Sequence, residues 1–158
     1  VGKDAARFFF LMRKSDAHLE FDLDLAKKTT SENPVYYVQY GHARIESIFR
    51  VARGNGIDLR SLAEADVHLL SVKEEIDLIK GLLHFYDVLE GSARSLESHR
   101  ITFYLLDLVG KFHSYYNKMR IIGDDANLTL ARLLLLHMLQ EVIRAGLNIL
   151  GVSAPERM

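Results

Sequence analysis

Two tyrosines and an arginine recur at helical spacing in the segment Tyr37-Val38-Gln39-Tyr40-Gly41-His42-Ala43-Arg44. At 100° per residue, Tyr37, Tyr40 and Arg44 fall within roughly 60° of arc, on one stripe of a helix. Unpaired bases stack on aromatic rings, and a guanidinium pairs with phosphate or stacks on a ring. The stripe could therefore grip single-stranded nucleic acid. Aromatic rings at this spacing are more often the partly buried edge of a helix–helix contact, so that alternative stays open.

A second cluster of the same character is Phe112-His113-Ser114-Tyr115-Tyr116-Asn117-Lys118, with Arg120 just beyond it. It offers aromatic rings, hydroxyls, an amide and cations to a nucleic acid. The alternative is that Phe112 and Tyr116 lie in the core while the other side chains are solvated. His113 taken by itself is more often a hydrogen-bonded structural histidine than a ligand.

Sequence patterns typical of several other chemistries are missing. There is no Gly-x-x-x-x-Gly-Lys-Ser/Thr loop and no Gly-x-Gly-x-x-Gly. None of the seven histidines has another three or four residues away, and no Glu-x-x-His occurs. The chain has no cysteine, and its Ser, His and Asp residues lack a nucleophile-elbow context. We therefore expect no metal site and no catalytic site in this chain.

The sequence pattern predicts that all the elements that position these clusters are helices. Asn33-Pro34 predicts a helix start, Gly54-Asn55-Gly56 predicts an end, and Ser71-Val72-Lys73-Glu74 matches a capping box. Asp22 is a plausible cap for a short helix. The expected helices span residues 3–14, 22–31, 34–53, 71–91, 100–122 and 127–150. We predict an all-α fold, a bundle of about five main helices, with the apolar last helix in its middle.

Apolar side chains at helical spacing give the faces that should turn inward. In the first helix they are Ala6, Phe9, Phe10 and Leu11. In the helix after Pro34 they are Val38, Gly41, Ile45, Ile48, Phe49 and Ala52. In the next two they are Ile76, Ile79, Leu83, Tyr86 and Leu89, then Ile101, Leu105, Leu108, Phe112, Tyr116 and Met119.

Length and composition set outer limits on the function. The chain has 158 residues, 49% hydrophobic and 26% charged, which suits one domain and excludes a disordered chain. The net charge of −1 shows no overall excess of positive charge for binding nucleic acid. The charge is unevenly distributed, with an acidic middle between two mildly basic ends. An acidic connector at Asp16–Asp24 precedes this middle. No uncharged apolar run reaches the roughly 18 residues of a membrane span, so we expect no membrane partner. A helical pattern that begins at Val1 suggests a cut N-terminus.

Three separated stretches carry a family resemblance. They are Asn33-Pro34-Val35-Tyr36-Tyr37-Val38-Gln39-Tyr40 with His42-Ala43-Arg44, then Phe112-His113-Ser114-Tyr115-Tyr116-Asn117, and the terminal Gly151-Val152-Ser153-Ala154-Pro155-Glu156-Arg157-Met158. In order and spacing they resemble the C-terminal part of bacterial arginyl-tRNA synthetases. Residues 2–25 resemble the stretch after the signature loop that closes the catalytic half, and the signal is weaker between residues 55 and 98.

The resemblance implies a domain organisation and a function. Residues 34–158 would be the helical anticodon-binding domain, often named for a DALR signature, and residues 1–33 a remnant of the end of the catalytic half. The parent would be a class I aminoacyl-tRNA synthetase that joins arginine to its tRNA with ATP and magnesium. The His-x-Gly-His and Lys-Met-Ser-Lys-Ser-like motifs of that class are missing here. We therefore expect this chain alone to hold no cofactor and to have no catalytic activity, and we expect a cytoplasmic monomer.

The resemblance also implies the site residues and the partners. Tyr37, Tyr40 and Arg44 would face the anticodon loop of arginine tRNA, whose middle base is cytosine. Tyr116 and Met158 would complete the pocket, with His113 and Asn117 as further candidates. The other partner would be the catalytic half of the parent chain.

Two alternatives to RNA binding remain open. The first is a helical protein-interaction module that docks a partner helix on the tyrosine stripe. The second is a structural tail of a larger enzyme, which predicts an exposed apolar patch around Phe8–Leu11.

Overall fold

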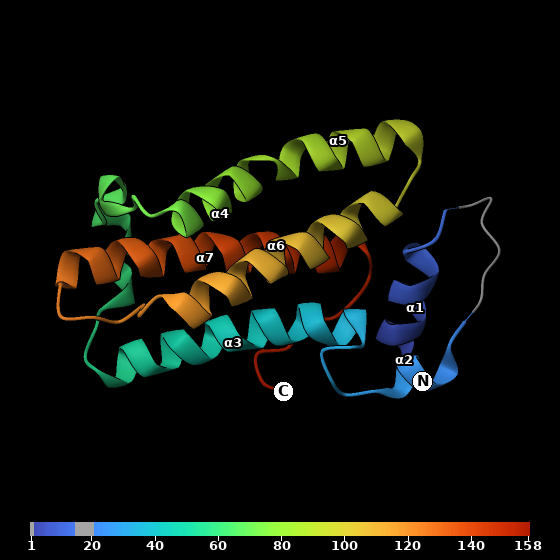
Figure 1. Ribbon diagram of the computed structural model, residues 1–158, viewed down its shortest axis with the longest axis horizontal. Helices are drawn as coiled ribbons and strands as arrows, with labels where there is room; N and C mark the ends of the chain where they lie inside the picture. Colours follow the sequence, from blue (N-terminus) through green and yellow to red (C-terminus); the bar gives the residue numbers. More distant parts are fainter. Residues whose placement is uncertain (1, 15–20) are drawn as a thin grey trace.

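The computed structural model describes residues 2–14 and 21–158. Residues 16–20 of the expected acidic connector Asp16–Asp24 lie outside the described residues, and its last two residues are already helical. Among the residues that the structure describes, every regular element is helical, which confirms the predicted all-α bundle (Figure 1). The elements are α1 (Lys3–Leu11), α2 (Leu23–Lys27), α3 (Pro34–Gly54), two 3₁₀ turns (Leu59–Glu64 and Val67–Leu69), α4 (Lys73–Leu83), α5 (Phe85–Ser95), α6 (His99–Lys118) and α7 (Ala126–Ile149).

Short polar side chains begin several of these helices. Asp22 accepts a hydrogen bond from the Leu25 amide at 2.9 Å and starts α2, as expected. Asn33 accepts one from the Val35 amide at 3.2 Å, with proline in the first turn of α3. These caps use amides that have no partner inside the helix, so the local sequence fixes where α2 and α3 begin.

Three long helices form the centre of the bundle, and α4 and α5 cover one side of it (Figure 1). Helices α3 and α6 run in the same direction, and α7 runs in the opposite direction. By length and composition alone α7 could cross a membrane. In the structure it packs against α3, α4, α6 and both 3₁₀ turns, while Met138 and Ile149 stay exposed. Its fully buried leucines and isoleucine are Leu133, Leu136, Leu139, Ile143 and Leu147.

Helices α3 and α6 approach closely at Gly41. A Cβ atom on that residue would lie only 2.8 Å from Cγ1 of Val109, a distance that real side chains do not adopt. Glycine therefore lets the two backbones lie nearer than any other residue would. The predicted buried stripe of α3 is confirmed, since all six of its residues are buried.

The expected single helix over 71–91 is wrong. The chain forms two helices, α4 and α5, which meet at a turn at His84. Leu83, before the break, and Tyr86, after it, are 74% and 71% exposed instead of buried. The buried residues of α4 are Glu75, Leu78 and Gly81. The capping carboxylate is Glu75, not Glu74: its Oε2 accepts from the amides of Ser71 (2.9 Å) and Val72 (3.2 Å).

Helix α6 is shorter than predicted and its inward face is different. It ends at Lys118, and Met119 is already extended, with φ −116° and ψ 135°. Tyr115 is fully buried and its hydroxyl donates to Oε1 of Glu75 at 3.1 Å. Tyr116, expected on the core stripe, is instead 38% exposed. A carboxylate inside the bundle thus selects Tyr115 as the core residue.

Helix α1 also turns a different face inward. Ala5 and Phe8 are buried, whereas Ala6, Phe9, Phe10 and Leu11 were expected to be. Phe10 is 55% exposed and stacks on Phe21, with ring centroids 5.7 Å apart. The exposed patch that the structural-tail alternative predicts over Phe8–Leu11 therefore does not form as such, because Phe8 belongs to the core.

Candidate functional site

The stripe on α3 is held together by Arg44. Its Nη2 donates to the hydroxyl of Tyr40, one turn earlier, at 2.8 Å. The guanidinium carbon lies 4.7 Å from the centroid of the Tyr40 ring, within the range of a cation–π contact. Arg44 is therefore fixed against the helix instead of extending freely into solvent.

His113 of α6 supports Arg44 from behind. Nη1 of Arg44 lies 3.3 Å from Nδ1 of His113. Since a guanidinium only donates, Nδ1 is the acceptor and the imidazole proton sits on Nε2. Burial, together with the Arg44 charge, lowers the pKa of His113 to about 4, so the ring is neutral at neutral pH. Tyr37 packs its ring against this imidazole, with centroids 4.9 Å apart.

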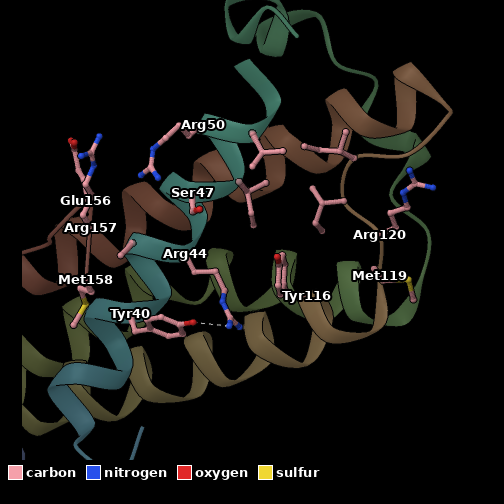
Figure 2. A pocket seen from close by; sticks show the side chains of 15 residues that line it. Tyr40, Arg44, Ser47, Arg50, Tyr116, Met119, Arg120, Glu156, Arg157 and Met158 are labelled. Carbon is pink, nitrogen blue, oxygen red and sulfur yellow. Dashed lines mark hydrogen bonds between the residues drawn. The ribbon is translucent and has the colours of Figure 1, made fainter. Parts of the chain in front are cut away.

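Tyr116 brings a second aromatic ring to the same guanidinium. The Arg44 carbon lies 5.0 Å from the centroid of the Tyr116 ring, and 4.7 Å from that of Tyr40. The cation thus lies between two rings that come from α3 and α6. Figure 2 shows Tyr116 facing Arg44, with the Tyr40–Arg44 hydrogen bond drawn as a dashed line.

These groups border an open hollow with a volume of about 790 Å³. Its walls come from α3, the end of α6, the extended segment that follows, and the C-terminal tail (Figure 2). The lining residues are Tyr40, Ala43, Arg44, Ser47, Ile48, Arg50, Val51, Tyr116, Met119, Arg120, Ile121, Ile122, Glu156, Arg157 and Met158. Two rings, an apolar floor and several cations thus share one solvent-accessible space.

The hollow is positively charged. Four arginines, Arg44, Arg50, Arg120 and Arg157, line it against one acid, Glu156, which leaves an excess of three positive charges. The arginines that form ion pairs among the described residues are others: Arg53, Arg60, Arg94, Arg100, Arg132 and Arg144. The cations of the hollow are therefore not neutralised by those pairs and can attract an anionic ligand.

The structure places the seven residues of the sequence hypothesis at different depths. Tyr40, Arg44, Tyr116 and Met158 line the hollow. Tyr37 and His113 lie behind Arg44 and do not line it. Asn117 is exposed at the end of α6 and does not line it either. The aromatic rings of α3 and α6 therefore do meet on one wet surface.

The seven residues of the sequence hypothesis leave out three of the cations, although Arg120 was noted beside the second cluster. Arg50 lies six residues beyond Arg44 on α3, which is about 120° away round the helix, so the helical wheel separates it from the stripe. Arg120 was hidden by the expectation that α6 continues to Ile122. Arg157 is placed by the path of the tail, for which no local pattern exists. Among the described residues, no group of three or more His, Asp or Glu side chains could hold a metal ion.

Comparison with known proteins identifies the family. The model of the DALR anticodon binding domain matches residues 38–158. The chain is 58% identical over its whole length to the arginine–tRNA ligase of Geobacter metallireducens and 52% identical to that of Syntrophotalea carbinolica. It spans about 28% of the length of each of these curated relatives.

Solved structures give the same answer. A putative arginyl-tRNA synthetase from Campylobacter jejuni superimposes with a TM-score of 0.90 at 32% identity, over 99% of this chain and 34% of that one. The arginyl-tRNA synthetase of Thermus thermophilus gives 0.82 at 29% identity, over 98% of this chain and 26% of that one. Fold and sequence agree. The chain belongs to the DALR anticodon-binding family, as the anticodon-binding domain found in arginyl-tRNA synthetases.

Proposed function

We propose that the hollow between α3, α6 and the C-terminal tail binds the anticodon loop of arginine tRNA. One observation carries this proposal: the guanidinium of Arg44 lies 4.7 Å and 5.0 Å from the ring centroids of Tyr40 and Tyr116. Flat faces on two helices, with a cation between them, suit an unpaired base that stacks on a ring while Arg44 contacts its edge or phosphate. Met158 adds an adaptable apolar contact beside them.

The remaining arginines suit the backbone of the same loop. Arg50, Arg120 and Arg157 surround the apolar floor of the hollow. A phosphate chain that crosses it would meet a cation from each wall, which contributes affinity without base specificity. In this arrangement Tyr37 and His113 hold Arg44 in place, and the exposed Asn117, next to Tyr116 on α6, would contact a flanking nucleotide.

The family relatives suggest the role of the longer protein. We infer that it is a class I arginine–tRNA ligase of the cytoplasm, which uses ATP with magnesium and acts as a monomer. Residues 1–33 would then close the catalytic half, and residues 34–158 would hold the anticodon. Arginine-dependent pyrophosphate exchange would require the part of the protein that carries the class I motifs, and would not be detected from this chain alone.

The direct test is replacement of one stacking ring. A base–aromatic stack contributes about 1–3 kcal/mol, so Tyr40→Ala should weaken binding of an arginine anticodon hairpin by roughly 5- to 150-fold. Fluorescence anisotropy with a labelled hairpin measures this. The matched control is Tyr86→Ala on α5, whose ring is 71% exposed and does not line the hollow.

A second RNA separates recognition from general attraction. The same hairpin with its middle cytosine replaced should bind more weakly to the unmodified chain. Equal affinity of the chain and its Tyr40→Ala variant for the arginine hairpin would reject the proposed site. Failure to bind any RNA at low salt would favour the interaction-module alternative.

A further inference from the structure

The C-terminal tail has a fixed path without regular structure. The chain turns at Gly151, which has φ +66°, and residues 151–158 then run back beside α3 (Figure 1). Its last three residues line the hollow. Terminal segments are ordinarily mobile unless other parts of the protein hold them. The contacts that hold this tail therefore decide whether Arg157 and Met158 contribute to the site.

A buried glutamine and an aspartate hold the middle of the tail. Nε2 of Gln39, which is 9% exposed, donates to the carbonyl of Ser153 at 3.0 Å and to its hydroxyl at 3.2 Å. The same amide donates to Oδ2 of Asp4 at 3.0 Å. That carboxylate oxygen also accepts from the Ser153 amide at 3.2 Å and from the Ser153 hydroxyl. One serine thus closes a network that joins α1, α3 and the tail.

Two further contacts lie on either side of Ser153. Nη1 of Arg7 donates to the carbonyl of Gly151 at 2.6 Å. His42 is fully buried, and its Nδ1 lies 2.8 Å from the carbonyl of Pro155. Since a carbonyl only accepts, Nδ1 carries the proton. The carbonyls of residues 151, 153 and 155 therefore each receive a hydrogen bond from α1 or α3, as expected for one side of an extended chain.

We propose that Asp4, Arg7, Gln39 and His42 are positioning residues that anchor the tail and so complete the RNA-binding hollow. Two of them belong to α1, which precedes the region 38–158 that the family model matches. The shape of the hollow thus depends on the docking of a helix outside the matched domain. By linkage, a ligand that contacts the tail also stabilises the docked position of α1. The RNA part of this inference rests on the proposed function.

The experiment measures tail order and RNA affinity separately. The variants are Asp4→Ala, Gln39→Met and their combination, and the control is Asp24→Ala, an exposed acid in the first turn of α2. Hydrogen–deuterium exchange of residues 152–158, measured without RNA, should become several-fold faster in the double variant and stay unchanged in the control. Binding of the arginine anticodon hairpin should weaken by roughly 3- to 30-fold in the double variant, because hydrogen bonds that order the tail are lost.

A milder variant guards against unfolding. Ser153→Ala removes only hydroxyl contacts from an exposed tail residue, and should shift both readouts in the same direction by less. Unchanged exchange in the double variant overturns the anchoring. Faster exchange with unchanged RNA affinity overturns the link to the hollow, while Tyr40→Ala still tests the proposed function. If the unmodified chain binds no hairpin, the RNA role fails, and the exchange rates alone decide whether these residues anchor the tail.

Discussion

Two polar clusters each contain one of two adjacent tyrosines of α6, and one cluster is open to solvent while the other is buried. Tyr116 lies 38% exposed beside Arg44 in the hollow, and Tyr115 is fully buried against Glu75. Each cluster contains a tyrosine and an arginine, drawn from helices that lie far apart in the sequence. One cluster is a candidate ligand site and the other is part of the core.

The buried cluster satisfies its charge internally. Oε1 of Glu75 accepts from Nε of Arg132 at 2.9 Å, and the exposed fractions of these side chains are only 1% and 13%. Nη1 of Arg132 donates further to the carbonyl of Arg120 at 2.8 Å. Burial, together with the negative charge of Glu75, raises the pKa of the Tyr115 hydroxyl well above its usual value, so it stays a neutral donor.

The open cluster contains no carboxylate. Arg44 meets two neutral acceptors, the Tyr40 hydroxyl and His113, so its charge is held in position without being cancelled. A neutral imidazole orients the guanidinium without repelling a phosphate. The two clusters differ in the partner of the arginine. A carboxylate neutralises the guanidinium of Arg132, which then stabilises the core, whereas neutral partners leave the charge of Arg44 available to a ligand.

The largest effect is expected from removal of the acid in the buried cluster. Glu75→Ala leaves Arg132 buried without its partner, which should lower the free energy of unfolding by about 3–5 kcal/mol. Urea denaturation followed by circular dichroism measures this. The matched control is Glu74→Ala, whose surface pair with Lys118 (2.8 Å) should contribute less than about 1 kcal/mol. Similar losses in the two variants would show that the buried Glu75–Arg132 pair is worth no more than a surface pair.

Removal of the arginine in the open cluster should change binding and leave the fold intact. We expect Arg44→Gln to weaken anticodon-hairpin binding by roughly 10- to 100-fold and to reduce the salt slope of log K by about one, because one phosphate contact is lost. The free energy of unfolding should change by less than about 1 kcal/mol. Arg94→Gln on α5, an exposed arginine paired with Glu90, is the control. An unchanged salt slope would place Arg44 on a base or a ring, not on a phosphate.

The smallest effect is a pH dependence that sharpens the role of His113. Its pKa is about 4 in the folded chain and about 6.5 when unfolded, so between these values the unfolded state binds more protons. The free energy of unfolding should therefore fall as the pH drops from 6.5 to 4, by about 1–2 kcal/mol from this group after allowance for solvent screening. His113→Gln should flatten this part of the curve. If both curves are parallel, burial and the Arg44 charge do not lower the pKa of His113 in the folded chain.

The sequence predicted well what depends on neighbours one or two turns away. The shared face of Tyr37, Tyr40 and Arg44, the buried stripe of α3, the cap at Asp22 and the helix start at Pro34 all follow from helical spacing and local sequence. These features need no knowledge of the other helices.

What the sequence could not predict depends on distant partners. Tyr115 and Tyr116 are both compatible with the apolar stripe of α6, and the choice is made by Glu75, 40 residues earlier. Arg120 is aligned by Arg132 through a contact with its carbonyl. Arg157 follows a tail whose anchor, Gln39, lies 114 residues from Ser153. No local pattern contains such information.

The glycine at the crossing of α3 and α6 has a consequence for ligand selection. Gly41 lies one turn before Arg44, and Val109 one turn before His113, so the closest approach of the two backbones directly precedes the polar groups that face each other. The packing of Gly41 against Val109 in the core therefore sets the spacing between the Tyr40 and Tyr116 rings. The width of the proposed RNA-binding hollow is in this sense a packing property, which depends on the absence of a side chain at Gly41.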